Sequence, residues 1–133
     1  QALQHGVAAH KEGKLQDAER LYRAILQSQP LHPDANHNLG VLAVSLNKAD
    51  AALPLFKTAL EANPKIEQFW LSYIDALIKA QQNELAGKML EQAKNREINE
   101  ERLKALEAQL RSINSIESVT GSSPPSKALK LVD

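Results

Sequence analysis

A ten-residue stretch that recurs after 34 residues constrains this chain more than any other feature. LYRAILQSQP, residues 21–30, aligns with LFKTALEANP, residues 55–64. The same shift superposes small residues on one another: Ala18, Ala52 and Ala86 at one place, and Gly6 and Gly40 at another. A fixed period of 20 to 50 residues is typical of proteins that stack copies of one structural unit.

The composition predicts that each unit is helical. Leu, Ala, Gln, Glu and Lys dominate the sequence, and these residues are strong helix formers. Between the two helical runs of a unit, Gly13 and Asn47 occupy the same place, and both residue types tolerate the left-handed conformation that ends a helix. Pro30 and Pro64 are expected to end the second helices, because the residue before a proline avoids the helical region.

Small residues are expected to let the two helices of a unit approach closely. The expected contacts pair Gly6 with Ala18 and Gly40 with Ala52. A bulky residue one turn later, Tyr22 or Phe56, would then fill the space beside them. Asp17 and Asp50 are expected to be the N-caps of the second helices.

A 34-residue unit of two helices resembles the tetratricopeptide repeat (TPR). The resemblance implies an all-α fold, a right-handed α-solenoid of three TPR helix pairs with a C-terminal capping helix. The expected TPR domain covers residues 1–114, with repeats at about 1–32, 33–66 and 67–94 and the capping helix at about 99–113. The third unit departs from the pattern, because Ile74 stands where the first two have glycine.

The region after the repeats predicts a helix and then a tail. Leu103, Leu106 and Leu110 recur at helical spacing, which suits a helix that covers the last apolar face of a solenoid. The alternative is a short dimerising coiled coil. Residues 115–133 are rich in serine and predict a flexible linker or tail, which leads either to cargo or only to its last seven residues, KALKLVD.

Composition excludes several classes of function. The 16 basic and 16 acidic residues balance, whereas nucleic-acid binders usually carry a basic excess. The chain lacks cysteine, a signal peptide and an apolar run of about 18 residues, so we expect a cytoplasmic protein with no membrane span. Its histidine pairs are five apart, whereas a helical metal pair is four apart. We therefore expect no metal, no cofactor and no enzymatic activity.

The TPR resemblance also implies where a ligand would bind. In that family the first helices of the units line a concave surface that holds peptides or partner helices. The corresponding candidates are Val7, His10, Lys11, His37, Asn38, Val41, Val44, Ser45, Leu71, Asp75, Ile78 and Lys79. Apolar members of this set alternatively belong to the core, and Asp75 alternatively pairs with Lys79.

Two of these candidates predict specific chemistry. The Asn38 amide can both donate to and accept from a peptide backbone. His37, with an ordinary pKa near 6.5, would make binding depend on pH. A clamp for a terminal carboxylate is not expected, because Leu3, Gln68 and Ser72 occupy the places that are basic in chaperone-binding TPR domains.

The sequence therefore predicts a protein-interaction scaffold that binds a peptide or partner helix in a concave groove. The alternative is an N-terminal arm of a larger glycosyltransferase, methyltransferase or sulfotransferase, since the segments at residues 8–26 and 32–43 resemble bacterial TPR arms of such enzymes. A third possibility is self-assembly into a homodimer. Proteins or peptides are the expected partners, rather than nucleic acid or membrane.

Overall fold

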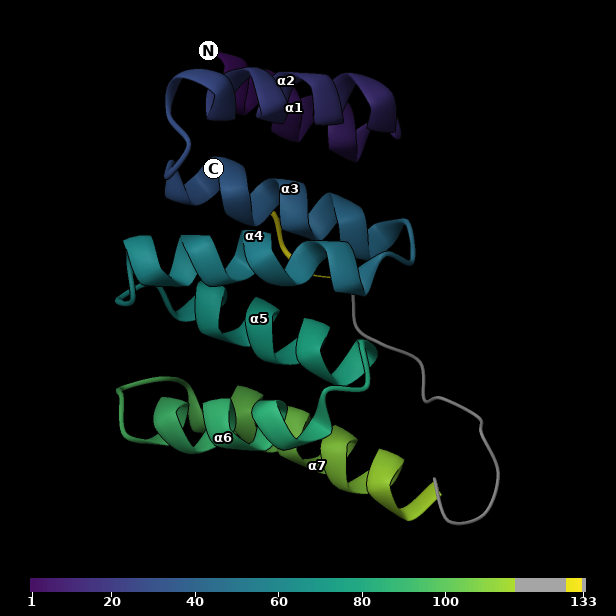
Figure 1. Ribbon diagram of the computed structural model, residues 1–133, viewed down its shortest axis with the longest axis vertical. Coiled ribbons are helices and arrows are strands. Elements are labelled where there is room, and N and C mark those ends of the chain that lie inside the picture. Colours follow the sequence, from purple (N-terminus) through teal and green to yellow (C-terminus); the bar gives the residue numbers. More distant parts are fainter. Residues whose placement is uncertain (117–128, 133) are drawn as a thin grey trace.

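The computed structural model describes residues 1–116 and 129–132, and within these residues all regular structure is helical. The helices are α1 (Ala2–Lys11), α2 (Leu15–Ser28), α3 (Pro33–Ser45), α4 (Ala49–Ala62), α5 (Glu67–Lys79), α6 (Asn83–Lys94) and α7 (Glu100–Ile116). They stack in successive layers, with α1 and α2 at one end of the molecule and α6 and α7 at the other (Figure 1). The predicted all-α solenoid of three helix pairs and an end helix is confirmed.

The turn inside each helix pair contains one residue in the left-handed region. Gly13 and Asn47 have φ values of 80° and 60°, as the sequence predicts. Gln81, another 34 residues on, has a φ of 62°. A non-glycine residue in this region is uncommon, so its recurrence at one place shows that the turn geometry is repeated in all three pairs.

The second helices do not begin where the sequence predicts. Lys14 and Lys48 occupy the N-cap positions of α2 and α4, and neither makes a side-chain cap hydrogen bond. Asp17 and Asp50 are therefore not N-caps. They lie inside the first turns, where a carboxylate interacts favourably with the positive end of the helix dipole.

Helix α3, which lies between α2 and α4 in the chain, has a side-chain N-cap. His32 is the N-cap of α3, and its Nδ1 atom accepts a hydrogen bond from the Ala35 N–H at 3.1 Å. Pro33 follows in the first turn, where a missing N–H costs nothing. The preceding helix α2 ends at Ser28, just before Pro30, as the proline predicts.

Each of the first two helix pairs is packed through a glycine that faces an aromatic ring. A Cβ atom added to Gly40 would lie 2.5 Å from Cε1 of Phe56, and one added to Gly6 would lie 2.5 Å from Cε1 of Tyr22. The expected contact of Gly40 with Ala52 stays a prediction. The ring itself fills the space that the missing side chain leaves.

The third pair reaches a similar packing with different residues. Ile74 replaces the glycine and Leu90 replaces the ring, and both are buried in one hydrophobic cluster. That cluster extends into α7, whose Leu103, Leu106 and Leu110 are also buried. Helix α7 packs against α5 and α6 and so covers the last apolar face.

The segment Leu129–Val132 returns to the middle of the solenoid. It lies beside α3, far along the chain from its neighbours there (Figure 1). Leu129, Leu131 and Val132 are partly buried against the hydrophobic cluster. The predicted flexible linker or tail at residues 115–133 includes these four residues, and residues 117–128 and 133 lie outside the described part.

Candidate functional site

The first helices of the three pairs enclose a cavity of about 730 Å³, which we call the groove. Its lining from these helices and the adjoining turn consists of His10, Lys11, Val41, Val44, Ser45, Asn47 and Lys79. Leu129, Lys130 and Leu131 complete it from the returning segment. Most of the helical lining residues are among those predicted for the concave surface, and Asn47 is an addition from the turn.

Asn38 on α3 holds the returning segment by its backbone. The amide Nδ2 donates to the Val132 carbonyl oxygen at 2.6 Å, and the amide oxygen accepts from the Val132 N–H at 2.8 Å. One side chain thus satisfies both backbone groups of one residue, as a neighbouring strand would. Asn38 is fully buried in this arrangement, so both hydrogen bonds are shielded from water.

A chain of hydrogen bonds behind Asn38 fixes the orientation of its amide. His37 Nδ1 lies 3.3 Å from the Asn38 amide oxygen, and His37 Nε2 lies 2.7 Å from the Ser72 hydroxyl. Since the amide oxygen can only accept, Nδ1 carries the proton and Nε2 accepts from Ser72. Gln68 Nε2 in turn donates to the Ser72 oxygen at 3.1 Å. The network links α5 to the residue that contacts the segment.

His37 supports the groove from inside the core rather than lining it. The ring is fully buried between Phe56 and Phe69, with centroid distances of 5.3 and 5.0 Å. Burial lowers the pKa of His37 to about 4, and the hydrogen bond with Asn38 offsets part of that effect. The expectation that His37 makes binding pH-dependent near 6.5 was therefore wrong.

Several other predicted residues also belong to the core. Leu71 and Ile78 are buried in the hydrophobic cluster, and Val7 is buried as well. Asp75 is only 5% exposed, and its Oδ2 atom lies 2.9 Å from the Lys79 ammonium nitrogen. Burial raises the pKa of Asp75, while the contact with Lys79 opposes that shift. The ion pair between these two residues is the alternative that the sequence left open.

His10 is the remaining titratable histidine of the groove. It is partly buried, and its burial lowers its pKa. Its Nδ1 atom is shielded from solvent and has no hydrogen-bond partner in the described part of the chain.

Sequence reasoning missed the segment Leu129–Val132 as part of the site. The alternation of Leu129 and Leu131 around the exposed Lys130 is the pattern of a half-buried extended chain, and it was the available signal. The supporting residues Gln68 and Ser72 were expected on the concave face, at places that are basic in a carboxylate clamp, and not as partners of His37. Their role depends on contacts between helices, which spacing alone does not reveal.

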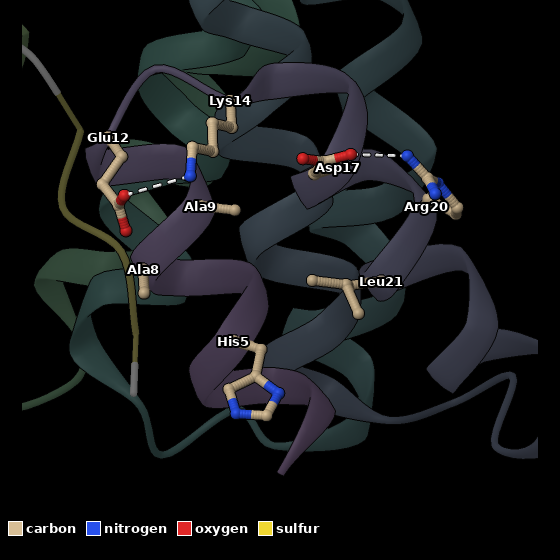
Figure 2. A pocket seen from close by; sticks show the side chains of 8 residues that line it. All are labelled: His5, Ala8, Ala9, Glu12, Lys14, Asp17, Arg20 and Leu21. Atoms are coloured by element: carbon tan, nitrogen blue, oxygen red, sulfur yellow. Dashed lines mark hydrogen bonds and ion pairs between the residues drawn. The ribbon is translucent and has the colours of Figure 1, made fainter.

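A second, smaller cavity of about 390 Å³ lies on α1, α2 and the turn between them (Figure 2). The ion pairs Glu12–Lys14 and Asp17–Arg20 stand at its rim, and His5 and Leu21 line its other end. The charged members of both pairs are largely exposed. Surface ion pairs of this kind contribute little and give the cavity no specific chemistry.

Residues 1–116 and 129–132 contain no group of three or more His, Asp or Glu side chains that could hold a metal ion. Among the helices of this same part, none is long and apolar enough to cross a membrane.

Comparison with known proteins agrees with the geometry. One tetratricopeptide repeat model matches residues 3–65, and another matches residues 43–110. The second match alone covers just over half of the chain. No curated protein matches the sequence significantly.

Solved structures give the same fold. The first TPR of Spaghetti (RPAP3), bound to the HSP90 peptide SRMEEVD, has a TM-score of 0.74 at 21% identity, with 88% of this chain and 90% of that chain covered. The Sgt2 TPR domain from Aspergillus fumigatus has a TM-score of 0.73 at 19% identity, with coverages of 99% and 88%. The 34-residue period, the stacked helix pairs and the family match lead to one conclusion: the chain belongs to the tetratricopeptide repeat family.

Proposed function

We propose that this chain is a protein-interaction module that binds an extended peptide in the groove. The observation that carries the proposal is the pair of hydrogen bonds between the Asn38 amide and the backbone of Val132. Those bonds use only groups that every non-proline residue has, so the same contact is open to any extended chain. The peptide-bound Spaghetti structure, which has the same fold, supports peptide recognition in general.

The wall of the groove adds selectivity to this backbone contact. Val41 and Val44 supply apolar surface, and Leu129 and Leu131 already lie in the same cavity. Apolar side chains that alternate along an extended peptide would bury surface there. Lys11 stands exposed at the edge, where it is available to polar groups of a ligand. We therefore expect a peptide with leucine or valine at alternate positions.

The experiment uses a synthetic fluorescein-labelled peptide KALKLVD and the full chain with Leu129→Ser and Leu131→Ser. These substitutions weaken the hold of the chain's own segment on the groove. Fluorescence anisotropy should show saturable binding to this double variant. Adding Asn38→Ala or Val44→Asp should weaken binding about tenfold or more, because each removes a separate contact.

Arg23→Ala is the matched control for that experiment. Arg23 is exposed on α2 and pairs with Glu19, away from the groove. The control should bind the peptide as the double variant does, with each fold checked by circular dichroism. Unchanged binding in both groove variants would place the site elsewhere and overturn the proposal. The alternative role as an arm of a larger transferase stays a prediction, which the reading frame beyond Asp133 tests.

A further inference from the structure

The groove of this chain already holds a peptide, and that peptide belongs to the chain. Val132 exchanges both of its backbone hydrogen bonds with Asn38, across 94 residues of sequence. Leu129, Leu131 and Val132 pack against the hydrophobic cluster, while Lys130 is exposed. The segment thus shows backbone pairing and alternating burial, which together are how an added strand is recognised.

We propose that Leu129–Val132 is a built-in occupant of the groove, which an external peptide has to displace before it binds. The inference rests on the proposed function, because it takes the groove to be a peptide site. It adds an identified competitor and a ligand class, an extended segment of the form Leu-x-Leu-Val. It also assigns the groove a closed state in the isolated chain.

Intramolecular occupancy follows from the geometry of a single chain. Val132 hydrogen-bonds to Asn38 of the same molecule, so the segment and its site belong to one chain. A segment tethered to its own site competes at an effective concentration of about 1 mM. A free peptide whose intrinsic dissociation constant is about 0.1 mM would therefore bind the closed chain about tenfold more weakly than an opened chain.

The pair of hydrogen bonds between Asn38 and Val132 favours the occupied state of the groove. Asn38 is fully buried in the occupied state, where the segment meets both polar groups of its amide. A buried amide without partners is costly, whereas here both of its polar groups are satisfied. Displacement therefore requires a ligand that restores the same two hydrogen bonds. A peptide backbone does this, and a purely apolar ligand does not.

The first test measures the occupant directly in the full-length chain. Amide hydrogen exchange by NMR should show the Val132 N–H protected, and Asn38→Ala should speed its exchange at least tenfold. The matched control, Arg23→Ala, changes an exposed residue of α2 outside the groove and should leave the protection unchanged. The protection of the Val132 N–H should also be independent of protein concentration, because the contact lies within one molecule. A Val132 amide that exchanges as fast in the wild type as in Asn38→Ala would overturn the proposal.

The second test measures competition with the labelled KALKLVD peptide. We expect about tenfold tighter binding to the Leu129→Ser/Leu131→Ser chain than to the wild type, and an intermediate affinity for Val132→Pro, which removes the N–H donated to Asn38. Equal affinity for wild type and the double variant would refute the built-in occupant while the peptide-binding function stands. Failure of the peptide to bind the double variant would refute the function instead, and the exchange measurement would still decide occupancy.

Sedimentation separates an occupant from the same chain from one supplied by a second copy. The wild type and the double variant should both sediment as monomers at the concentrations used for NMR. A wild-type dimer that dissociates on Leu129→Ser/Leu131→Ser, with Val132 protection that rises with concentration, would show exchange of segments between copies. That result would overturn the intramolecular assignment.

Discussion

The ring of Phe56 lies so close to the backbone of Gly40 that an added methyl carbon would stand 2.5 Å from its Cε1 atom. Both residues are buried, so neither the ring nor the helix has free space to yield into. The contact joins α3 to α4, the middle pair of the solenoid. It explains why a glycine, and not merely a small residue, recurs at this place in the first two repeats.

Gly40→Ala should therefore destabilise the chain by roughly 1–3 kcal/mol, because the methyl group overpacks the contact with Phe56. Urea unfolding followed by circular dichroism measures the change. Gly87→Ala is the matched control, since its methyl carbon would lie 4.0 Å from Leu110 in ordinary contact. That substitution lies inside α6 and should stabilise the chain by about 0.5–1 kcal/mol. Equal destabilisation by both changes would contradict the packing described.

The end helix α7 should contribute directly to stability. Leu103 is 3% exposed and belongs to the same cluster as Leu90, so Leu103→Ala should cost about 2–5 kcal/mol through lost burial and a cavity. Leu85→Ala, on the more exposed face of α6, should change stability by only about 0.5 kcal/mol. Denaturant titration of both variants checks the comparison. A neutral Leu103→Ala would show that α7 does not cover the solenoid.

His37 should make folding stability depend on acidity. Burial lowers its pKa to about 4 from the ordinary value of 6.5, so the unfolded chain binds the proton first as the pH falls. The contribution of neutral His37 to the free energy of unfolding is fully present above pH 6.5. It is lost as the pH falls from about 6.5 to about 4. The loss amounts to roughly 3 kcal/mol.

Urea unfolding of the wild type and of His37→Gln between pH 4 and pH 7.5 isolates that contribution. The free energy of unfolding should fall more steeply with acid for the wild type. Asp75, whose pKa is raised, is present in both proteins, so its effect cancels in the comparison. Parallel pH profiles for the two proteins would mean that His37 is not held neutral by the fold.

The sequence predicted local features of the fold better than contacts between repeats. Gly13 and Asn47 were identifiable because their residue types favour the left-handed region, whereas Gln81 takes the same conformation only because the repeat imposes it. The face of α3 that carries His37 and Asn38 was predictable from the repeat. The contact of Phe69, from the next repeat, with the His37 ring was not predictable. Helical spacing does not tell how closely a neighbouring helix packs.

The partner of Asn38 was beyond sequence reasoning for a different reason. Amide chemistry predicted a backbone contact at this residue, and the structure contains one. Val132, however, is 94 residues away and follows a stretch with no helical period, so no local pattern links the two. Four residues, of which Leu129, Leu131 and Val132 are half-buried, are too short a signal to mark a binding segment in advance.

Ser72 should control binding through the network rather than by touching the ligand. Its hydroxyl donates to His37 Nε2 at 2.7 Å, which keeps the proton on Nδ1 and the Asn38 amide in its orientation. Ser72→Ala would leave a buried ring nitrogen unpaired and loosen that amide. In the Leu129→Ser/Leu131→Ser chain it should weaken binding of labelled KALKLVD several-fold, as measured by anisotropy.

Ser45→Ala is the control for this prediction, because Ser45 lines the groove but its hydroxyl donates to the Leu42 carbonyl of its own helix. It should alter the affinity less than twofold. The Leu129→Ser/Leu131→Ser chain, which keeps Ser72, should bind labelled KALKLVD with the same affinity between pH 6 and pH 8. His37, with a pKa of about 4, remains neutral throughout that range. A larger loss from Ser45→Ala than from Ser72→Ala would show that the groove surface, and not the buried network, sets the strength of the backbone contact.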